Sequence, residues 1–164
     1  MKVLQASPLT REAFAPYGDL IQADATVERF PINNGTTMRF HELADVQALG
    51  AGARAIISIF RGQPFVPPVS LQLMERHPLG SQAFIPMRAE RFLLVVAPPG
   101  DGFSVADLRA FIANGSQGVN YHAGVWHHPL LSLDRVSDFL VVDRAGEGEN
   151  CEEQTLPEMV RVVV

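Results

Sequence analysis

The sequence predicts an all-β fold, a sandwich or barrel with minor short helices, because short apolar runs alternate with turn residues along most of its length. No long stretch repeats apolar residues at helical spacing. Gly- and Pro-containing turns such as Pro67–Pro68 and Asn114–Gly115 separate the runs. With 164 residues, 47% of them hydrophobic, the chain is expected to form a single domain over residues 1–164 around a packed core.

The individual elements follow from this pattern. Thr10 is a suitable N-cap for a short helix that ends before Gly18. Asp45–Leu49 and Ser104–Arg109 each predict one helical turn. The last apolar run would be an exposed strand edge unless a partner subunit or another strand of the same barrel covers it. The expected strands cover residues 53–60, 70–77, 83–86, 91–97, 110–112, 125–133, 136–143 and 159–164.

Composition excludes several classes of function. The formal net charge is −5 and the 13 basic residues are scattered, so nucleic acid is not an expected partner. The only lysine, Lys2, lies at the terminus, which argues against Schiff-base chemistry. The only cysteine, Cys151, follows a polar loop and is expected to be a bystander thiol. The longest apolar stretch, 92–99, is too short for a membrane helix of about 20 residues, and no signal-peptide pattern is seen, so a cytoplasmic protein without a membrane partner is expected.

The first candidate site lies at the end of the run 70–77. Alternate side chains of a strand share a face, so Leu71, Leu73, Glu75 and His77 are expected on one side and Arg76 on the other. The apolar side of this strand thus ends in a carboxylate and an imidazole. Two interpretations remain open: a hydrogen-bonded polar pair at a barrel rim, or a polar site in the mouth of a barrel.

The second candidate site is the histidine-rich segment 118–129. In a strand, Val125 and His127 share one face, and Trp126 and His128 share the other. At least one of the two adjacent histidines must therefore have another role. Trp126 is expected in the core or in a subunit interface. Metal binding by this segment is a hypothesis, and a core or surface histidine is the simpler alternative.

These two segments resemble the two motifs of the cupin family. Glu75-x-His77-x4-Gln82 stands where the first motif has His-x-His-x3–4-Glu, and His122-x-Gly-x2-His127 stands where the second has Pro-x-Gly-x2-His. The resemblance implies a double-stranded β-helix, or jelly-roll, barrel. The sequence departs from the pattern at Glu75, Gln82 and His122. A mixed set of oxygen and nitrogen donors still suits a divalent metal, and the metal ligands implied by the motifs are Glu75, His77, Gln82 and His127.

Longer blocks resemble the ureidoglycolate lyase family from about Val3 to Pro157. That resemblance implies an enzyme that splits ureidoglycolate into glyoxylate and urea in allantoin (purine) catabolism. It also implies a cytoplasmic homodimer with nickel or another divalent metal, and no organic cofactor is expected. The blocks that carry the resemblance are 30–35, 75–87, 108–112, 114–122, 125–130 and 136–144.

The reaction needs a base for the hydroxyl proton, an acid for the departing nitrogen and a cation for the carboxylate. Under this resemblance His127 is expected to be a metal ligand or the general base, with His77 as its partner, since imidazole titrates near neutral pH. Glu75 would bind the metal or, without one, orient His77. Gln82 would bind the substrate carboxylate or ligate the metal through its carbonyl oxygen.

Three further residues are candidates. Arg61 ends the apolar run 55–60 and is the candidate clamp for the carboxylate, because a guanidinium matches a carboxylate in bidentate fashion. An ordinary rim charge is the alternative for Arg61. His122 and Tyr121 are candidate proton donors, and Tyr121 is also a candidate substrate contact.

Two other functions remain open from the sequence. The first is a non-catalytic cupin that binds a small molecule, which the departures at Glu75 and Gln82 favour. The second is another metal-dependent cupin enzyme, such as an oxygenase that uses Glu75, His77 and His127 as a facial set. Oxygen consumption would separate that enzyme from a lyase.

Overall fold

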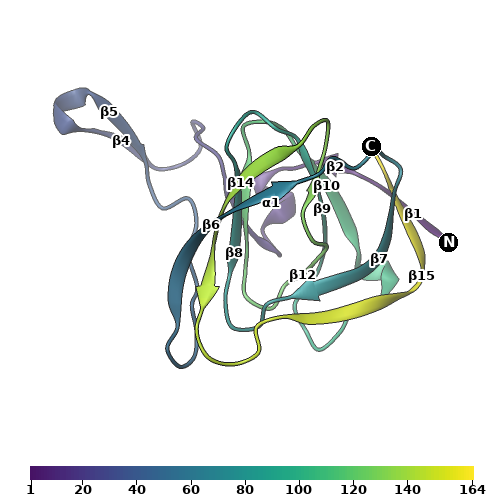
Figure 1. Ribbon diagram of the computed structural model, residues 1–164. Coiled ribbons are helices and arrows are strands. Elements are labelled where there is room, and N and C mark those ends of the chain that lie inside the picture. The colour runs from purple at the N-terminus through teal and green to yellow at the C-terminus, as the bar shows by residue number, and fades with distance from the viewer.

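The computed structural model describes residues 1–164 and confirms the all-β class, with strands that form a nearly closed, cupin-like barrel (Figure 1). Helix is limited to the turn α1 (Arg11–Phe14) and two 3-10 turns, η1 (Asn33–Gly35) and η2 (Val105–Asp107). None of these helices is long and apolar enough to cross a membrane.

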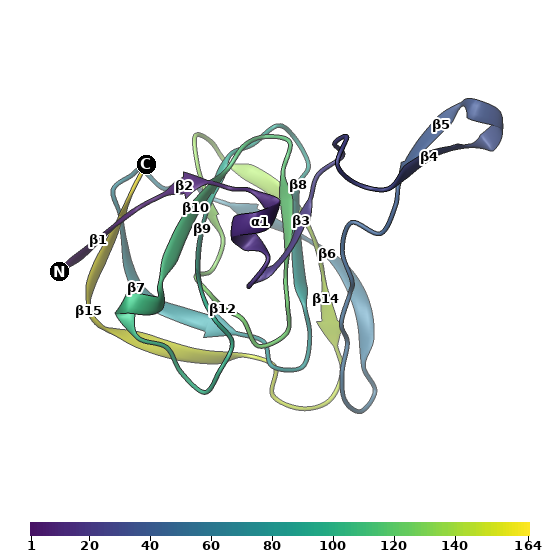
Figure 2. The same cartoon turned by 180° about the vertical axis from the view of Figure 1, so that it is seen from behind.

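The larger sheet has eight strands and is closed by the N-terminal segment. Its order is β1-β15-β7-β12-β9-β10-β2, with β13 also paired to β9. The consecutive strands β1 and β2 pair with β15 and β10, which lie at opposite ends of the sheet. The sheet therefore curls into a barrel (Figures 1 and 2). Its strands are β1 (Lys2–Gln5), β2 (Ser7–Pro8), β7 (Val69–Arg76), β9 (Phe92–Ala97), β10 (Arg109–Ala113), β12 (Trp126–His127), β13 (Leu131–Ser132) and β15 (Glu152–Val163).

A smaller sheet of five strands, in the order β3-β11-β8-β14-β6, lies against the larger one. The two strands that belong to neither sheet, β4 and β5, pair only with each other and form a hairpin that stands out from the barrel in both views (Figures 1 and 2). These strands are β3 (Gly18–Ile21), β4 (Arg29–Ile32), β5 (Thr37–Phe40), β6 (Arg54–Gly62), β8 (Gln82–Pro86), β11 (Gly118–Tyr121) and β14 (Ser137–Ala145).

Strand β9 separates two hydrophobic cores, and all six of its residues are buried. Leu93 and Val95 pack into the core inside the curled sheet, together with Trp126. Leu94 and Val96 pack into the core shared with the smaller sheet. Burial on both faces explains why this strand is a continuous apolar run rather than an alternating one.

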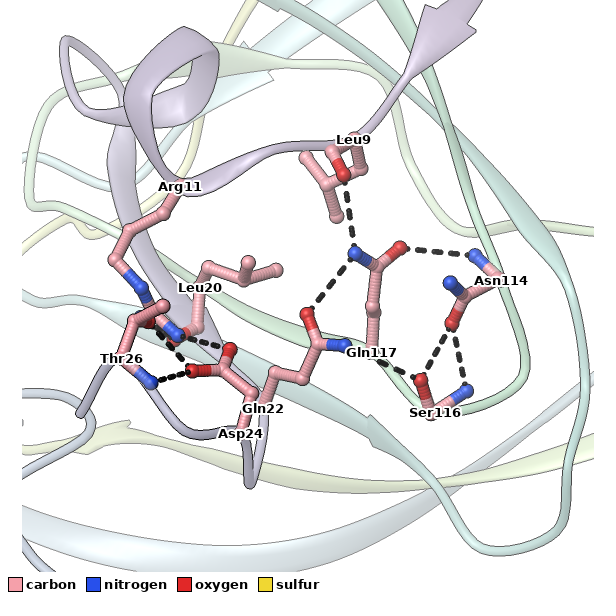
Figure 3. A network of polar contacts seen from close by, with 9 residues as sticks. All are labelled: Leu9, Arg11, Leu20, Gln22, Asp24, Thr26, Asn114, Ser116 and Gln117. Carbon is pink, nitrogen blue, oxygen red and sulfur yellow. Dashed lines mark hydrogen bonds and ion pairs between the residues drawn. The ribbon is translucent and has the colours of Figure 1, made fainter.

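A polar network fixes the N-terminal segment to the turn between β10 and β11 (Figure 3). The buried amide of Gln117 donates to the carbonyl oxygen of Leu9 at 3.0 Å and to Oε1 of Gln22 at 3.2 Å. Nearby, Arg11 donates to Asp24 at 3.0 Å. These groups line a cavity of about 470 Å³ but already satisfy one another, so the network is structural.

Two of the three predicted helical turns are present. Oγ1 of Thr10 accepts a hydrogen bond from the amide of Ala13 at 3.2 Å, which confirms the predicted N-cap. The turn η2 is closed by a capping box between Ser104 and Asp107, as the segment 104–109 predicted.

The prediction of a helical turn over Asp45–Leu49 is wrong. The backbone of this segment bonds to residues 79–81 instead: the amide of Leu49 donates to Leu79, and the carbonyl oxygen of Gln47 accepts from Ser81. These long-range bonds use groups that a helix would need for its own ladder.

Two strand predictions also change. The expected strand 125–133 is interrupted at Pro129, which has no amide hydrogen for the ladder, and it forms the separate strands β12 and β13. The C-terminal run forms the end of a longer strand, β15, which pairs with β1 and β7 of the same chain. The apolar edge predicted there is therefore covered within the chain.

Candidate active site

Strands β7 and β12 bring an acidic side chain and two imidazoles together. Glu75 and His127 are directly opposed in the register of these strands. Oε1 of Glu75 lies 3.6 Å from Nε2 of His127 and 3.7 Å from Nε2 of His77. The three residues form a group whose potential ligand atoms all lie within 4.8 Å of one another. The shared placement of Glu75 and His77 agrees with the sequence, and Arg76 points away to contact the ring of Trp126.

The alternation predicted back from Glu75 to Leu71 does not hold. Leu71 and Met74 both pack in the core of the curled sheet, although strict alternation would place them on opposite faces. The break lies opposite the irregularity in β15 between Thr155 and Val160. This change of face lets one strand contribute Leu71 to one core and Glu75 to the site on the other side.

His127 holds an unpaired lone pair in the interior. The side chain is only 2% exposed. Its Nδ1 must donate to the carbonyl oxygen of Val125, 3.0 Å away, which leaves Nε2 unprotonated in the neutral ring. Nε2 is buried without a hydrogen-bond partner. The ring of Tyr121 is stacked on the imidazole at 4.2 Å with an angle of 7°, and so fixes its plane.

His77 faces hydrogen-bond acceptors on both sides. Its Nδ1 donates to the carbonyl oxygen of Asn150 at 2.7 Å, while Nε2 lies 3.1 Å from Oε1 of Gln82. The amide of Gln82 is oriented by Asp143, because Nε2 of Gln82 donates to this carboxylate at 3.2 Å. Oε1 of Gln82 must therefore point at His77. A neutral His77 would place a lone pair against this oxygen, so a proton or another cation is needed between them.

Charge at the site favours an ionised Glu75. Burial raises the pKa of the Glu75 carboxyl group, but its interaction with His127, whose Nε2 lies 3.6 Å away, and with the rings of His77 and His128 when these are protonated outweighs burial, so the pKa lies below its usual value. When both rings are neutral, the carboxylate oxygen, the two imidazole Nε2 atoms and the oxygen of Gln82 present only lone pairs to one another. These lone pairs can bind a divalent metal ion or a shared proton.

A pocket of about 490 Å³ connects Glu75 to the surface. Phe60 and Phe84 form part of its apolar wall. Arg61 is its only basic lining residue, and its guanidinium makes two bonds, of 2.7 and 2.9 Å, to the carboxylate of Asp138. The predicted clamp therefore lies at the pocket, but its charge is already paired.

The remaining predicted residues divide into two groups. Tyr121 reaches the site through its stack on His127, and burial followed by the charge of Glu75 raises the pKa of its phenol, which stays protonated. His122 is not brought to the site, because its Nε2 lies 3.1 Å from Asp19 on the other face of the strand. His128 does not join the group of Glu75 and His127, as expected for two adjacent histidines.

The sequence did not indicate three neighbours of the site. Phe139, Val141 and Asp143 occupy alternate positions of β14 and so share one face of the strand. An acidic residue in line with two buried apolar residues is a signal by which the sequence could have indicated Asp143. Asn150 acts through its backbone carbonyl, which leaves no signal in the sequence. Cys151 is exposed as expected, yet its thiol lies 3.9 Å from Oε2 of Glu75.

Comparison with known proteins gives a consistent result. A family model described as "Ureidoglycolate lyase" matches residues 1–163. A ureidoglycolate lyase of Pseudomonas syringae pv. syringae is 54% identical over 164 residues, which cover 100% of this chain and 96% of the relative. Those of Pseudomonas entomophila and Burkholderia mallei are 55% and 53% identical, each over 96% of this chain and 94% and 92% of the relative.

Proposed function

Because the chain belongs to the ureidoglycolate lyase family, we propose that it is a carbon–nitrogen lyase that splits ureidoglycolate into glyoxylate and urea at the Glu75–His77–His127 cluster. The buried, unpartnered Nε2 of His127, aimed at Glu75 beside a pocket, is the observation that supports this location. A non-catalytic binding protein would have no need to keep such a lone pair unsatisfied in its interior.

The reaction moves one proton and breaks one bond. The hydroxyl group of ureidoglycolate loses its proton, its oxygen forms the aldehyde double bond, and the bond from the same carbon to the ureido nitrogen breaks. That nitrogen takes the electron pair and a proton to become urea. No water is consumed, so the site needs a base, an acid and a way to hold the anionic substrate.

The two histidines differ in a way that suits these roles. His127 presents a free lone pair at Nε2 and takes the hydroxyl proton. His77 faces a hydrogen-bond acceptor at each ring nitrogen and, when protonated, gives its Nε2 proton to the departing nitrogen. Glu75 lies between the two Nε2 atoms and stabilises the positive charge as it passes from one ring to the other.

The same atoms fit the divalent metal that the family resemblance implies. Glu75, His77 and His127 would hold it, and Gln82 is placed to add its amide oxygen. When bound, the ion would supply Lewis-acid chemistry by polarising the substrate hydroxyl and carboxylate. Nickel is proposed from the resemblance alone.

The surrounding residues have supporting roles. Tyr121 holds the plane of His127, and Asp143 holds the amide of Gln82 toward the site. Arg61 lines the pocket but is paired with Asp138, so no substrate contact is assigned to it. His122 has no role in this proposal, since Asp19 binds it away from the cluster. The place in allantoin catabolism, in the cytoplasm, follows from the family resemblance.

The experiment is to measure urea and glyoxylate release by the purified protein as isolated, after chelation, and after addition of nickel, manganese or zinc. Nickel binding is measured in parallel by calorimetry for the wild type and for His127→Ala. Release that is lost on chelation and restored by one metal, with weaker binding to the variant, supports the metal-assisted lyase. Full release after chelation supports catalysis by the two histidines alone and refutes a role for a metal ion. No release under any condition overturns the proposed function.

A further inference from the structure

The hairpin of β4 and β5, residues 29–40, is separate from the barrel and is here called the arm. It stands away from the body of the molecule in both views (Figures 1 and 2). Its strands pair only with each other, and no hydrogen bond or ion pair joins residues 29–40 to the body. A two-stranded hairpin on its own is only marginally stable in water, so the arm needs another surface to hold it.

The arm is basic and carries apolar side chains. Arg29 and Arg39 are its only charged residues, and neither makes an ion pair or a hydrogen bond. Arg39 lies over the ring of Phe30 at 6.0 Å, which holds its charged end at the side of the hairpin. Met38 is 50% exposed on the opposite face. A surface that fits the arm must therefore be acidic.

The loop of residues 146–151 between β14 and β15 provides such a surface. Glu147 and Glu149 are exposed there and form no ion pair. The loop borders the active site directly, because the carbonyl oxygen of Asn150 binds His77 and the thiol of Cys151 lies near Glu75. The charge of the arm is thus complementary to a loop beside the reaction centre.

The pocket also lacks a free cation for an anionic substrate. Arg61 is the only basic residue in its lining and is paired with Asp138. Arg76 points away from the pocket, toward Trp126, and is paired with Glu152. A substrate carboxylate in this pocket would therefore meet no unpaired guanidinium group of the same chain.

We propose that the arm of one molecule docks on the acidic loop of a second copy of this chain, where Arg39 binds the carboxylate of the substrate. This inference rests on the proposed function, since it assigns the group that holds ureidoglycolate. Each active site is then built from two chains, with Glu75, His77 and His127 from one and Arg39 from the other. In a closed pair of copies, each arm serves the partner's site.

The test combines two impaired variants in one dimer. Arg39→Ala should raise KM by about ten- to a hundredfold, because it removes a hydrogen bond to a charged group. Glu75→Gln should nearly abolish turnover. The two variants, with different tags, are co-expressed, and the mixed dimer is purified by both tags. One of its two sites then has an intact cluster and an intact arm, so it should show about half the wild-type rate per dimer at low substrate concentration.

Several results would overturn the inference. A mixed dimer no more active than its two parent dimers at low substrate concentration would show that the arm serves its own chain. A fully active Arg39→Ala variant would show that this residue does not bind substrate. The control is Arg161→Ala, an exposed arginine on β15 that forms no ion pair and should keep wild-type kinetics.

Sedimentation separates this inference from the proposed function. The wild type should be a dimer, and replacement of residues 30–39 by two glycines should shift it toward monomer while the circular dichroism of the barrel is kept. A monomeric wild type, or a dimer unchanged by loss of the arm, would overturn the docking whatever the enzymatic result. If deletion of the arm makes the protein monomeric but the wild type releases no urea, the docking is supported and the proposed function is refuted.

Discussion

Replacement of Glu75 by glutamine removes one charge from the centre of the site and keeps the shape of the side chain. In the proposed reaction His127 becomes positively charged as it takes the hydroxyl proton, with Oε1 of Glu75 only 3.6 Å from its Nε2. A charge pair near this distance is worth about 4 kcal/mol at an effective dielectric constant of about 20.

The burial of Glu75 offsets part of that energy, because it disfavours the carboxylate. If about 3 kcal/mol of transition-state stabilisation remains, Glu75→Gln slows turnover by about a hundredfold. The loss should appear in kcat more than in KM, since the charge on His127 develops during the reaction.

The assay is steady-state release of urea from ureidoglycolate, with thermal unfolding to confirm that the variant is folded. Glu12→Gln is the matched control, because Glu12 is exposed on α1 and forms no ion pair. It should keep the wild-type rate. A Glu75→Gln variant within about threefold of the wild type would refute the role given to this carboxylate.

Three further predictions concern the surroundings of the site and the fold. Tyr121→Ala should cost about 3–5 kcal/mol of stability by chemical unfolding and lower activity, whereas Tyr121→Phe keeps the stack on His127 and should be close to wild type in both. Arg61→Ala should change KM by less than about threefold in the urea assay, because its exposed guanidinium is already paired. Hydrogen bonds from the hydroxyl and amide of Thr26 are the main cause that lowers the pKa of Asp24 below 3.8. The ionised Asp24 therefore stabilises the fold above that pH, and this contribution is lost as the pH falls through the folded-state pKa. Asp24→Asn should be less stable than wild type at pH 7, and urea unfolding should show the difference disappear in strong acid.

The sequence was a good guide to the all-β class because apolar runs and turn residues are local signals. It was a poor guide where distant segments decide the structure. Asp45–Leu49 has a helical composition, yet its backbone is bound by residues 79–81. The projecting arm was not predicted as a hairpin, since no core-facing alternation marks the residues 29–40.

The site could be predicted in part for the same reason. Alternation along β7 placed Glu75 and His77 together, and the motif resemblance added His127 and Gln82. Alternation could not show that His122 would turn to Asp19, because this contact joins residues that are far apart in the sequence. The backbone carbonyl that holds His77 is likewise invisible to any analysis of side-chain types.

The measurement that tests the central claim most directly is the product balance of the purified protein with ureidoglycolate, with urea, glyoxylate and ammonia determined in the same sample. The lyase reaction predicts urea and glyoxylate in equal amounts with no ammonia, at a rate that His127→Ala reduces by about a hundredfold or more. Release of ammonia in place of urea, or an unchanged rate in the variant, would contradict the reaction or the site assigned to it.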